Sequence, residues 1–197
     1  MVSMNELTEL SLFSGGGGGV LASKLLGHRI IGYVEWDKYC QQVLAARITD
    51  GFIDAAPIFT DVREFVQSGA AREYRGFADV VSGGFPCQPF SHAGKRGGVE
   101  DERNMWPATL EVVKCVEPSI CFFENVPGLL SASVDNGPNG PVFYYGEILR
   151  DLAETRLFDR INWGVLGADD VGAAHRRKRL WILGDSNGTN RLTVKTE

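Results

Sequence analysis

The feature that most constrains the fold is a run of five glycines between an apolar segment and a helical one. Residues 7–13 are largely apolar and predict a strand. Ser14 and glycines 15–19 follow, and residues 20–26 then have helical spacing up to Gly27. Glycine adopts backbone angles that other residues avoid and lets the main chain approach a ligand closely. The order strand, glycine turn, helix is typical of dinucleotide-binding folds, although a flexible glycine loop remains an alternative.

An acidic residue ends the next predicted strand. Residues 29–34 predict this strand, and Glu35 follows it about 20 residues after the glycine turn, where such folds hydrogen-bond a ribose. Trp36 offers a flat face for an adenine ring. A solvated strand end and a core aromatic are the alternatives, but the combination with the glycine turn favours a nucleoside site. Residues 37–47 predict a helix with Asp37 as its N-cap.

A second Gly/Pro-rich turn carries a cysteine. Residues 78–81 predict a short buried strand that leads into residues 83–91, GGFPCQPFS. Cys87 lies between Pro86 and Gln88, so the backbone holds it in place, as a nucleophile requires. An ordinary small buried cysteine is the alternative. The polar residues 92–104 after this turn predict a mobile lid.

A carboxylate ends another apolar strand. Residues 119–123 predict a buried strand that ends in Glu124, and a charge at this place is costly unless it has a function. Asp61 precedes a predicted short helix and either caps that helix or accepts a hydrogen bond from an adenine amino group. The other elements expected are helices at 62–71, 105–116 and 142–155, a turn-rich loop at 131–141, strands at 160–166 and 179–183, and a poorly ordered polar tail at 185–197.

Length and composition indicate one globular domain. The chain has 197 residues, with 44% hydrophobic and 23% charged residues, so we expect a single domain over residues 1–184 followed by the tail. The net charge of −5 argues against a surface that is basic throughout, but a local basic face for nucleic acid remains open. No membrane segment or signal peptide is evident. Four cysteines without a C-x-x-C pair, with three histidines, predict no metal site and reduced thiols in a cytoplasmic protein.

Four motifs in this order resemble those of the cytosine-C5 DNA methyltransferase family. They are Phe13-x-Gly15, Pro86-Cys87-Gln88, Glu124-Asn125-Val126 and Arg177-x-Arg179, and the resemblance covers about residues 8–184. The resemblance implies a Rossmann-like class I S-adenosylmethionine-dependent methyltransferase fold. This fold is an α/β structure with a doubly wound, mostly parallel sheet and helices on both faces.

The resemblance also implies roles for residues in catalysis. Cys87 would add as a thiolate to C6 of cytosine and so activate C5 for methylation. Glu124 would hold the N3 edge of the base and donate a proton or hydrogen bond there. Arg177 and Arg179 would contact the base carbonyl, the surroundings of the thiolate or a phosphate, and a nearby guanidinium favours the thiolate form.

The methyl donor of the family is S-adenosylmethionine, and its substrate is a cytosine flipped out of duplex DNA. By resemblance, the cofactor site would be formed by Phe13, Gly15, Gly17, Glu35, Trp36, Asp61, Val62 and Pro86. The residues expected to touch the opened DNA strand are Gln88, Ser91, Lys95 and Arg96.

The sequence departs from the family pattern in several places. Ser11 and His175 replace residues that are usually Asp and Gln, and the glycine run is longer than usual. The expected target-recognition region and return segment do not occur before Glu197. The chain could therefore be a truncated enzyme, one half of an enzyme that needs a second polypeptide for DNA recognition, or a cofactor-binding protein without turnover. An RNA cytosine as the target also remains open.

Overall fold

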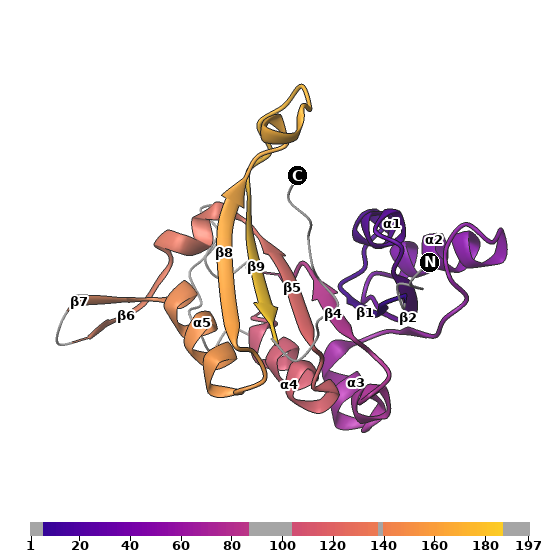
Figure 1. Ribbon diagram of the computed structural model, residues 1–197, viewed down its shortest axis with the longest axis horizontal. Helices are drawn as coiled ribbons and strands as arrows, with labels where there is room; N and C mark the ends of the chain where they lie inside the picture. The colour runs from indigo at the N-terminus through magenta and orange to yellow at the C-terminus, as the bar shows by residue number, and fades with distance from the viewer. Residues whose placement is uncertain (1–5, 87–103, 138–139, 187–197) are drawn as a thin grey trace, which may run out of the picture.

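The computed structural model describes residues 6–86, 104–137 and 140–186, and the side chains of 134–141 are not described. The described residues form a seven-stranded sheet with helices on both faces, together with a separate two-stranded hairpin (Figure 1). This architecture confirms the predicted doubly wound α/β fold.

The sheet is mostly parallel and has the strand order β3-β2-β1-β4-β5-β9-β8. The five strands from β3 to β5 in this order are parallel to one another, whereas β9 is antiparallel to both of its neighbours. Their bounds are β1 (Thr8–Leu12), β2 (Arg29–Val34), β3 (Ile58–Phe59), β4 (Val80–Gly83), β5 (Ile120–Asn125), β8 (Arg160–Leu166) and β9 (Arg179–Asp185).

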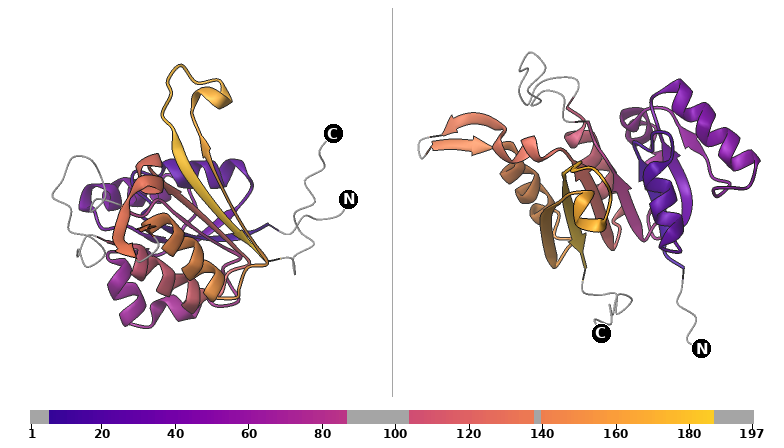
Figure 2. Two further views of the ribbon diagram at one scale, coloured as in Figure 1. Left: turned by 90° about the vertical axis from the view of Figure 1, so that its left-hand side faces the viewer. Right: turned by 90° about the horizontal axis from the view of Figure 1, so that it is seen from above.

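Helices cover the two faces of the sheet unequally. On one face lie α1 (Gly18–Leu25) and α2 (Lys38–Thr49), with a small core around Val20, Tyr33 and Leu44. The larger core is on the other face, under α3 (Val62–Gln67), α4 (Trp106–Val116) and α5 (Tyr144–Glu154). Figure 2 shows these three helices grouped on their side of the sheet. None of the described helices is long and apolar enough to cross a membrane.

The sheet reverses its direction of winding at β1. This strand pairs with β2 on one side and with β4 on the other, so the strands that follow β1 in the sequence are added first on one side of it and then on the other. Ligands of such sheets bind beside this point, at the carboxyl ends of the strands. The two strands approach closely here, since a Cβ at Gly83 would lie 2.6 Å from the carbonyl oxygen of Leu12. The close pairing of β1 and β4 therefore requires glycine, which has no Cβ, at position 83.

Two segments differ from the sequence prediction. The prediction of a loop at 131–141 is wrong, because β6 (Ser133–Gly137) and β7 (Gly140–Phe143) pair as an antiparallel hairpin. As a result, α5 begins only at Tyr144, two residues later than predicted. These strands have few apolar residues and no clear alternation, so the main-chain pairing left little trace in the sequence. Residues 48–59 predict a less regular connection, but the structure has the short β3 at its end.

The chain end is ordered slightly further than expected. Asp185 ends β9, and the N–H of Ser186 donates to the carbonyl oxygen of Ser119 at 3.0 Å. Of the predicted tail, only residues 187–197 lie outside the described part of the chain. Short 3-10 helices complete the fold: η1 (Ala70–Tyr74), η3 (Pro127–Ser131) and η4 (Asp169–Val171).

Candidate active site

The predicted site residues converge because of strand direction. The parallel strands β1, β2, β4 and β5 all end at the same edge of the sheet, and the antiparallel strand β9 begins there. This edge therefore receives Phe13 after β1, Glu35 after β2, Gly84 after β4 and Arg179 at the start of β9. The β8–β9 connection projects beyond the same edge (Figure 1).

Glu35 fastens the glycine turn to the end of β2. Its carboxylate is 8% exposed, and Oε2 accepts the N–H of Gly15 at 2.6 Å while Oε1 accepts the N–H of Asp37 at 2.8 Å. Each oxygen keeps a further lone pair, so the carboxylate can still accept a hydroxyl hydrogen from a ligand. Glu35 thus shapes the turn as well as presenting an acceptor next to it.

The glycine turn is open on its outer side and unusual in its backbone. Gly15 and Gly17 have φ of 55° and 92°, and Phe13 has φ of 51°, a left-handed conformation that a bulky residue rarely adopts. A Cβ added at Gly15, Gly16, Gly18 or Gly19 would meet no atom within 4 Å. The main chain of the turn can therefore be approached closely by a bound molecule.

The other residues predicted for the cofactor vary in accessibility. Trp36 is 69% exposed beside Glu35, and Pro86 is also exposed. The side chain of Val62 is buried in the larger core, so its main chain alone could reach a ligand.

Asp61 acts as a helix cap. Its carboxylate accepts the backbone N–H of Arg63 at 2.8 Å and pairs with the Arg63 guanidinium at 2.9 Å, so the capping alternative drawn from the sequence is confirmed. The hydrogen bond from the Arg63 side chain is the largest of the effects that lower the pKa of Asp61.

Glu124 and Arg179 form an ion pair at the carboxyl end of β5. Arg179 Nε lies 2.5 Å from Glu124 Oε1, and the two side chains are 22% and 33% exposed, respectively. The antiparallel register sets Glu124 opposite Trp181, two residues from Arg179 on the same face of β9. The other carboxylate oxygen faces Gly84, where a Cβ would lie 2.9 Å from Oε2. Glu124 is thus held by Arg179 on one side and borders the turn that follows β4 on the other.

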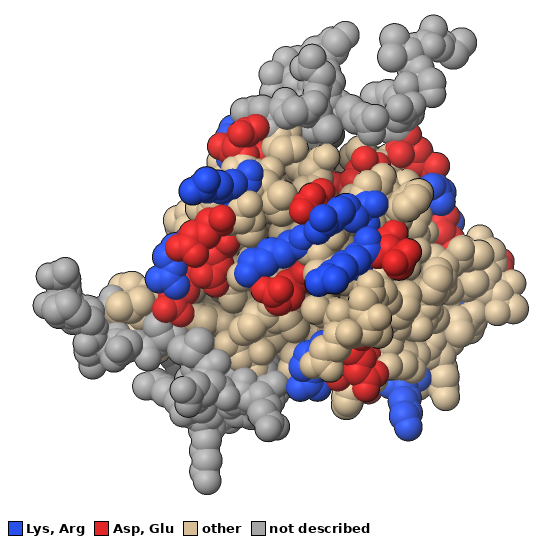
Figure 3. Space-filling model, turned by 90° about the horizontal axis from the view of Figure 1, so that it is seen from below, with Lys and Arg blue, Asp and Glu red and all other residues tan. Residues whose placement is uncertain are grey.

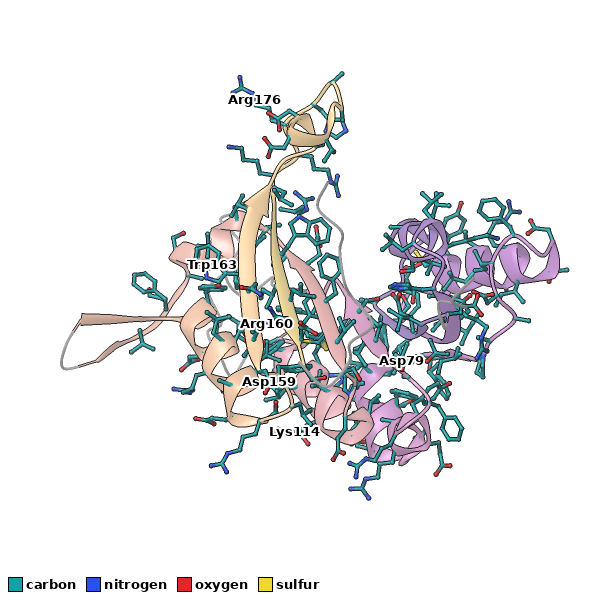
Figure 4. The ribbon with its side chains drawn as sticks, viewed as in Figure 1. Asp79, Lys114, Asp159, Arg160, Trp163 and Arg176 are labelled. Carbon is teal, nitrogen blue, oxygen red and sulfur yellow. The ribbon has the colours of Figure 1, made fainter. Side chains whose placement is uncertain are left out.

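Arg177 is placed differently from Arg179. It precedes β9 and is exposed, and among the described contacts Arg179 is the arginine that reaches Glu124. Arg176, its neighbour, lies far out on the projecting connection (Figure 4). The structure therefore does not bring the two predicted catalytic arginines to the same carboxylate.

Sequence reasoning missed a role for Asn125. This side chain is 4% exposed, and its Nδ2 donates to the carbonyl oxygen of Phe85 at 3.0 Å while its Oδ1 accepts the N–H of Val126 at 2.8 Å. It ties the end of β5 to the chain two residues before Cys87. The sequence did contain a signal for this role, because Asn125 is an amide that follows a buried strand and lies inside the Glu124-Asn125-Val126 motif.

The predicted nucleophile and DNA contacts lie outside the described residues. These are Cys87, Gln88, Ser91, Lys95 and Arg96, together with residues 92–103 of the predicted lid. The described cysteines are free, but Cys121 is fully buried and its burial raises its pKa to about 12. Burial also raises the pKa of Cys40. The buried Cys121 thiol is therefore not suited to act as a nucleophile.

Charge is mixed on the face of the molecule at the opposite edge of the sheet. Figure 3 views the molecule from below, at the opposite edge of the sheet, and shows Lys and Arg side chains interspersed with Asp and Glu. The ion pairs of α4 and its surroundings include Arg75–Glu117 and Lys114–Glu111. Within the described ranges, no group of three or more His, Cys, Asp or Glu side chains is arranged to hold a metal ion.

Comparisons with known proteins agree with this geometry. Residues 7–197 match the family model described as C-5 cytosine-specific DNA methylase. The chain is 30% identical over 182 residues to the Type II methyltransferase M.NgoMIV of Neisseria gonorrhoeae, a match that covers 92% of this chain and 53% of the relative. It is 31% identical over 188 residues to M.HpaII of Haemophilus parainfluenzae, covering 94% of this chain and 48% of the relative.

A similar fold occurs among solved structures. A DNA modification methyltransferase encoded within an E. coli prophage matches with a TM-score of 0.67 at 24% identity, over 92% of this chain and 47% of that chain. The present chain thus spans about half the length of the curated relatives that it matches.

Proposed function

Because the chain belongs to the C-5 cytosine-specific DNA methylase family, we propose that it transfers a methyl group from S-adenosylmethionine to C5 of a cytosine in DNA. The observation that carries the proposal is the Glu124–Arg179 pair, which borders the turn after β4 on the edge of the sheet where the glycine turn also lies. The Type II methyltransferases among the relatives suggest a role in restriction and modification in the cytoplasm.

The residues at the carboxyl ends of β1 and β2 suit this cofactor. The open main chain at Gly15 and Gly17 would border the methionine part, and Glu35 would accept hydrogen bonds from the ribose hydroxyls. The exposed ring of Trp36 would stack on the adenine, and Phe13 and Pro86 would line the same site. While it caps α3, Asp61 would also accept a hydrogen bond from the adenine amino group, and the main chain of Val62 would meet the adenine edge. When bound, the sulfonium group supplies an electrophilic methyl.

Cys87 would be the nucleophile. Its thiolate would add to C6 of cytosine, and the electron pair of the C5–C6 double bond would move to C5, which is otherwise a poor nucleophile. Attack by C5 on the methyl group then forms the new C–C bond. Loss of the C5 proton to a base and departure of the Cys87 sulfur from C6 would restore the double bond and the free thiolate.

Glu124 and Arg179 would stabilise the base during this addition. Glu124 would hold the N3 edge and donate a proton or hydrogen bond there, which cancels the negative charge that builds up on the ring once the thiolate has added. Arg179 would fix the orientation of Glu124 and extend toward the base carbonyl. Arg177, on the exposed segment before β9, would contact a phosphate of the DNA.

DNA contact would come from the chain after Cys87. Gln88, Ser91, Lys95 and Arg96 would touch the opened strand around the flipped cytosine. Readout of a target sequence requires side chains in a groove, and we propose that a further polypeptide region, corresponding to the remaining length of the relatives, supplies them.

Methyl transfer from labelled S-adenosylmethionine tests the proposal. The chain, alone and together with the unmatched part of M.HpaII, is incubated with cytosine-containing DNA and, separately, with RNA. We expect label in DNA, lost in Cys87→Ala, and a covalent protein–DNA adduct when the target is 5-fluorocytosine.

The buried Cys121 supplies the matched control. Cys121→Ala should keep both the transfer and the adduct. Transfer that survives in Cys87→Ala, or label found only in RNA, would contradict the proposed reaction.

A further inference from the structure

A buried carboxylate that the proposed chemistry does not use lies on β1. Glu9 is 2% exposed and points to the face of the sheet that α1 covers, whereas Leu10 and Leu12 point into the larger core on the other face. Burial of a carboxylate is costly unless several donors satisfy its oxygens. The partners of Glu9 therefore indicate what the fold gains from it.

Three side chains from three segments bind this carboxylate. The Ser23 hydroxyl on α1 donates to Oε1 at 2.8 Å, and the Ser82 hydroxyl on β4 donates to the same oxygen. His28 Nδ1, in the connection between α1 and β2, lies 2.7 Å from Oε2. One side chain on β1 thus joins α1, the segment before β2, and β4.

The elements that Glu9 joins lead to two parts of the candidate site. The helix α1 begins within the glycine run, and β4 leads through Gly83 and Gly84 into the turn that contains Pro86 and Cys87. Since α1 packs on β1 and β2 (Figure 1), the two serine hydroxyls on Oε1 give it a polar link to β4 as well. A shift of α1 against β4 would change the distance between the glycine turn and the turn after β4.

We propose that Glu9 is a positioning residue for methyl transfer, which holds the glycine turn and the turn after β4 at the separation that S-adenosylmethionine requires. The inference rests on the proposed cofactor site, which both turns would line. Glu9 does not need to touch the cofactor, because it acts through Ser23 and Ser82.

The variant Glu9→Leu removes this link without leaving its partners stranded. Leucine has a similar size, and apolar replacement of a buried charged group together with its network is often neutral for stability. Ser23 Oγ has the carbonyl oxygen of Gly19 at 3.2 Å as a second acceptor, while Ser82 and His28 are partly exposed and can bind water. The variant should therefore fold, which circular dichroism and urea unfolding verify.

Cofactor affinity is the first readout. In Glu9→Leu we expect isothermal titration to give about 10-fold weaker binding of S-adenosylmethionine, the effect of losing one hydrogen bond to a charged group, while the midpoint of urea unfolding stays unchanged. Glu9→Gln should restore most of the affinity, because its amide oxygen still accepts both serine hydroxyls and its N–H₂ can donate to a neutral His28. A merely structural role would change the midpoint and leave the affinity of the folded chain as it is.

Asp79→Leu is the matched control. Asp79 Oδ2 accepts the N–H and the hydroxyl of Thr8, each at 2.9 Å, so this carboxylate also ties β1 to the beginning of β4, but at the amino ends of the strands. Its loss should leave the cofactor affinity at the wild-type value. An equal loss of affinity in Asp79→Leu and Glu9→Leu would overturn the inference, because any weakening of the β1–β4 pairing would then suffice.

Hydrogen exchange followed by mass spectrometry gives a second readout that requires neither cofactor nor turnover. The amides of residues 15–25 and 82–86 should exchange about 10-fold faster in Glu9→Leu than in the wild type. Those of α4 should keep their wild-type rates, because α4 lies on the opposite face of the sheet. Wild-type exchange in both segments would overturn the inference.

The positioning role and the proposed function can fail separately. If the wild-type chain does not bind S-adenosylmethionine, the proposed cofactor site fails, and hydrogen exchange then decides about Glu9: faster exchange in the two segments supports the link, and wild-type exchange overturns it. If the wild type and Glu9→Leu bind the cofactor equally well, the cofactor site stands and the positioning role of Glu9 is overturned.

Discussion

Arg179 Nε lies 2.5 Å from Oε1 of Glu124, and this contact joins the end of β5 to the beginning of β9. A carboxyl group that is already oriented needs little reorganisation to donate a proton or hydrogen bond to a base on which negative charge develops. The pair therefore links the fold of the sheet to the proposed chemistry, and each of its two residues can be substituted separately.

Replacement of Arg179 should slow methyl transfer without weakening cofactor binding. In Arg179→Ala, Glu124 loses its fixed orientation, and we expect single-turnover transfer to fall about 100-fold. Isothermal titration should give an unchanged affinity for S-adenosylmethionine. Arg160→Ala is the control, since Arg160 is 61% exposed and pairs with Asp185 at the other end of β9. An equal loss of rate in both variants would argue for a merely structural effect.

Glu35→Gln should weaken binding of S-adenosylmethionine about 10-fold, as expected for the loss of one charge-assisted hydrogen bond. The amide leaves one oxygen to accept from Gly15 or Asp37 and turns an N–H₂ toward the other donor. Isothermal titration with the cofactor measures this change. Glu64→Gln provides the comparison, because Glu64 is exposed on α3, and it should bind the cofactor normally. An unchanged affinity of Glu35→Gln for S-adenosylmethionine would show that Glu35 does not bind the cofactor.

Loss of the Asn125 amide should destabilise the fold. Asn125→Ala leaves the carbonyl of the buried Phe85 without its side-chain partner, at a cost of about 1–3 kcal/mol, and also removes the acceptor of the Val126 N–H. Urea unfolding measures the change, with the exposed Asn162→Ala as the comparison. The same variant should lower the yield of the 5-fluorocytosine adduct, because Phe85 anchors the chain just before Cys87. Formation of the adduct at the wild-type rate would show that Asn125 does not help to position the nucleophile.

We expect Asp61 to make the free energy of unfolding depend on pH under acidic conditions. Its pKa is lowered in the folded protein, chiefly by the hydrogen bond from Arg63, so its charge stabilises the fold above the unfolded pKa of about 3.9. This contribution is lost as the pH falls through the lower folded pKa. Asp61→Asn keeps a good helix cap, and it should be less stable than the wild type by up to about 1 kcal/mol at pH 7.

Unfolding experiments at two pH values check this sign. The difference between wild type and Asp61→Asn should narrow when urea unfolding is repeated near pH 3, where Asp61 is largely protonated in the unfolded chain. A difference that is the same at both pH values would mean that the loss comes from the cap alone and not from the charge.

Much of the fold could be predicted because each main strand has a local signal. Residues 29–34 are a β-prone run that only Gly32 interrupts, and Asp37 is a capping residue before a helical pattern. Both predictions are confirmed. The hairpin of β6 and β7 was missed because its pairing depends on main-chain hydrogen bonds rather than on an apolar pattern. A sequence shows such pairing only through its turn residues.

The candidate site was harder to predict than the fold. The closeness of Glu35 to the glycine turn could be predicted from the dinucleotide-binding pattern, but the helix-capping contact of Asp61 could be offered only as one of two alternatives. The contact of Arg179 with Glu124 depends on the antiparallel register of β9, which no local pattern specifies. Arg177 and Arg179 carry the same side chain two positions apart, so only the register distinguishes them.

The position of β9 between β5 and β8 also bears on biosynthesis. The edge strand β8 emerges from the ribosome first, yet it pairs with the sheet only through β9. Until Arg179 and the strand behind it have been synthesised, Glu124 has no partner and the sheet stops at β5. A nascent chain of this design can therefore complete the seven-stranded sheet only after translation has passed Asp185.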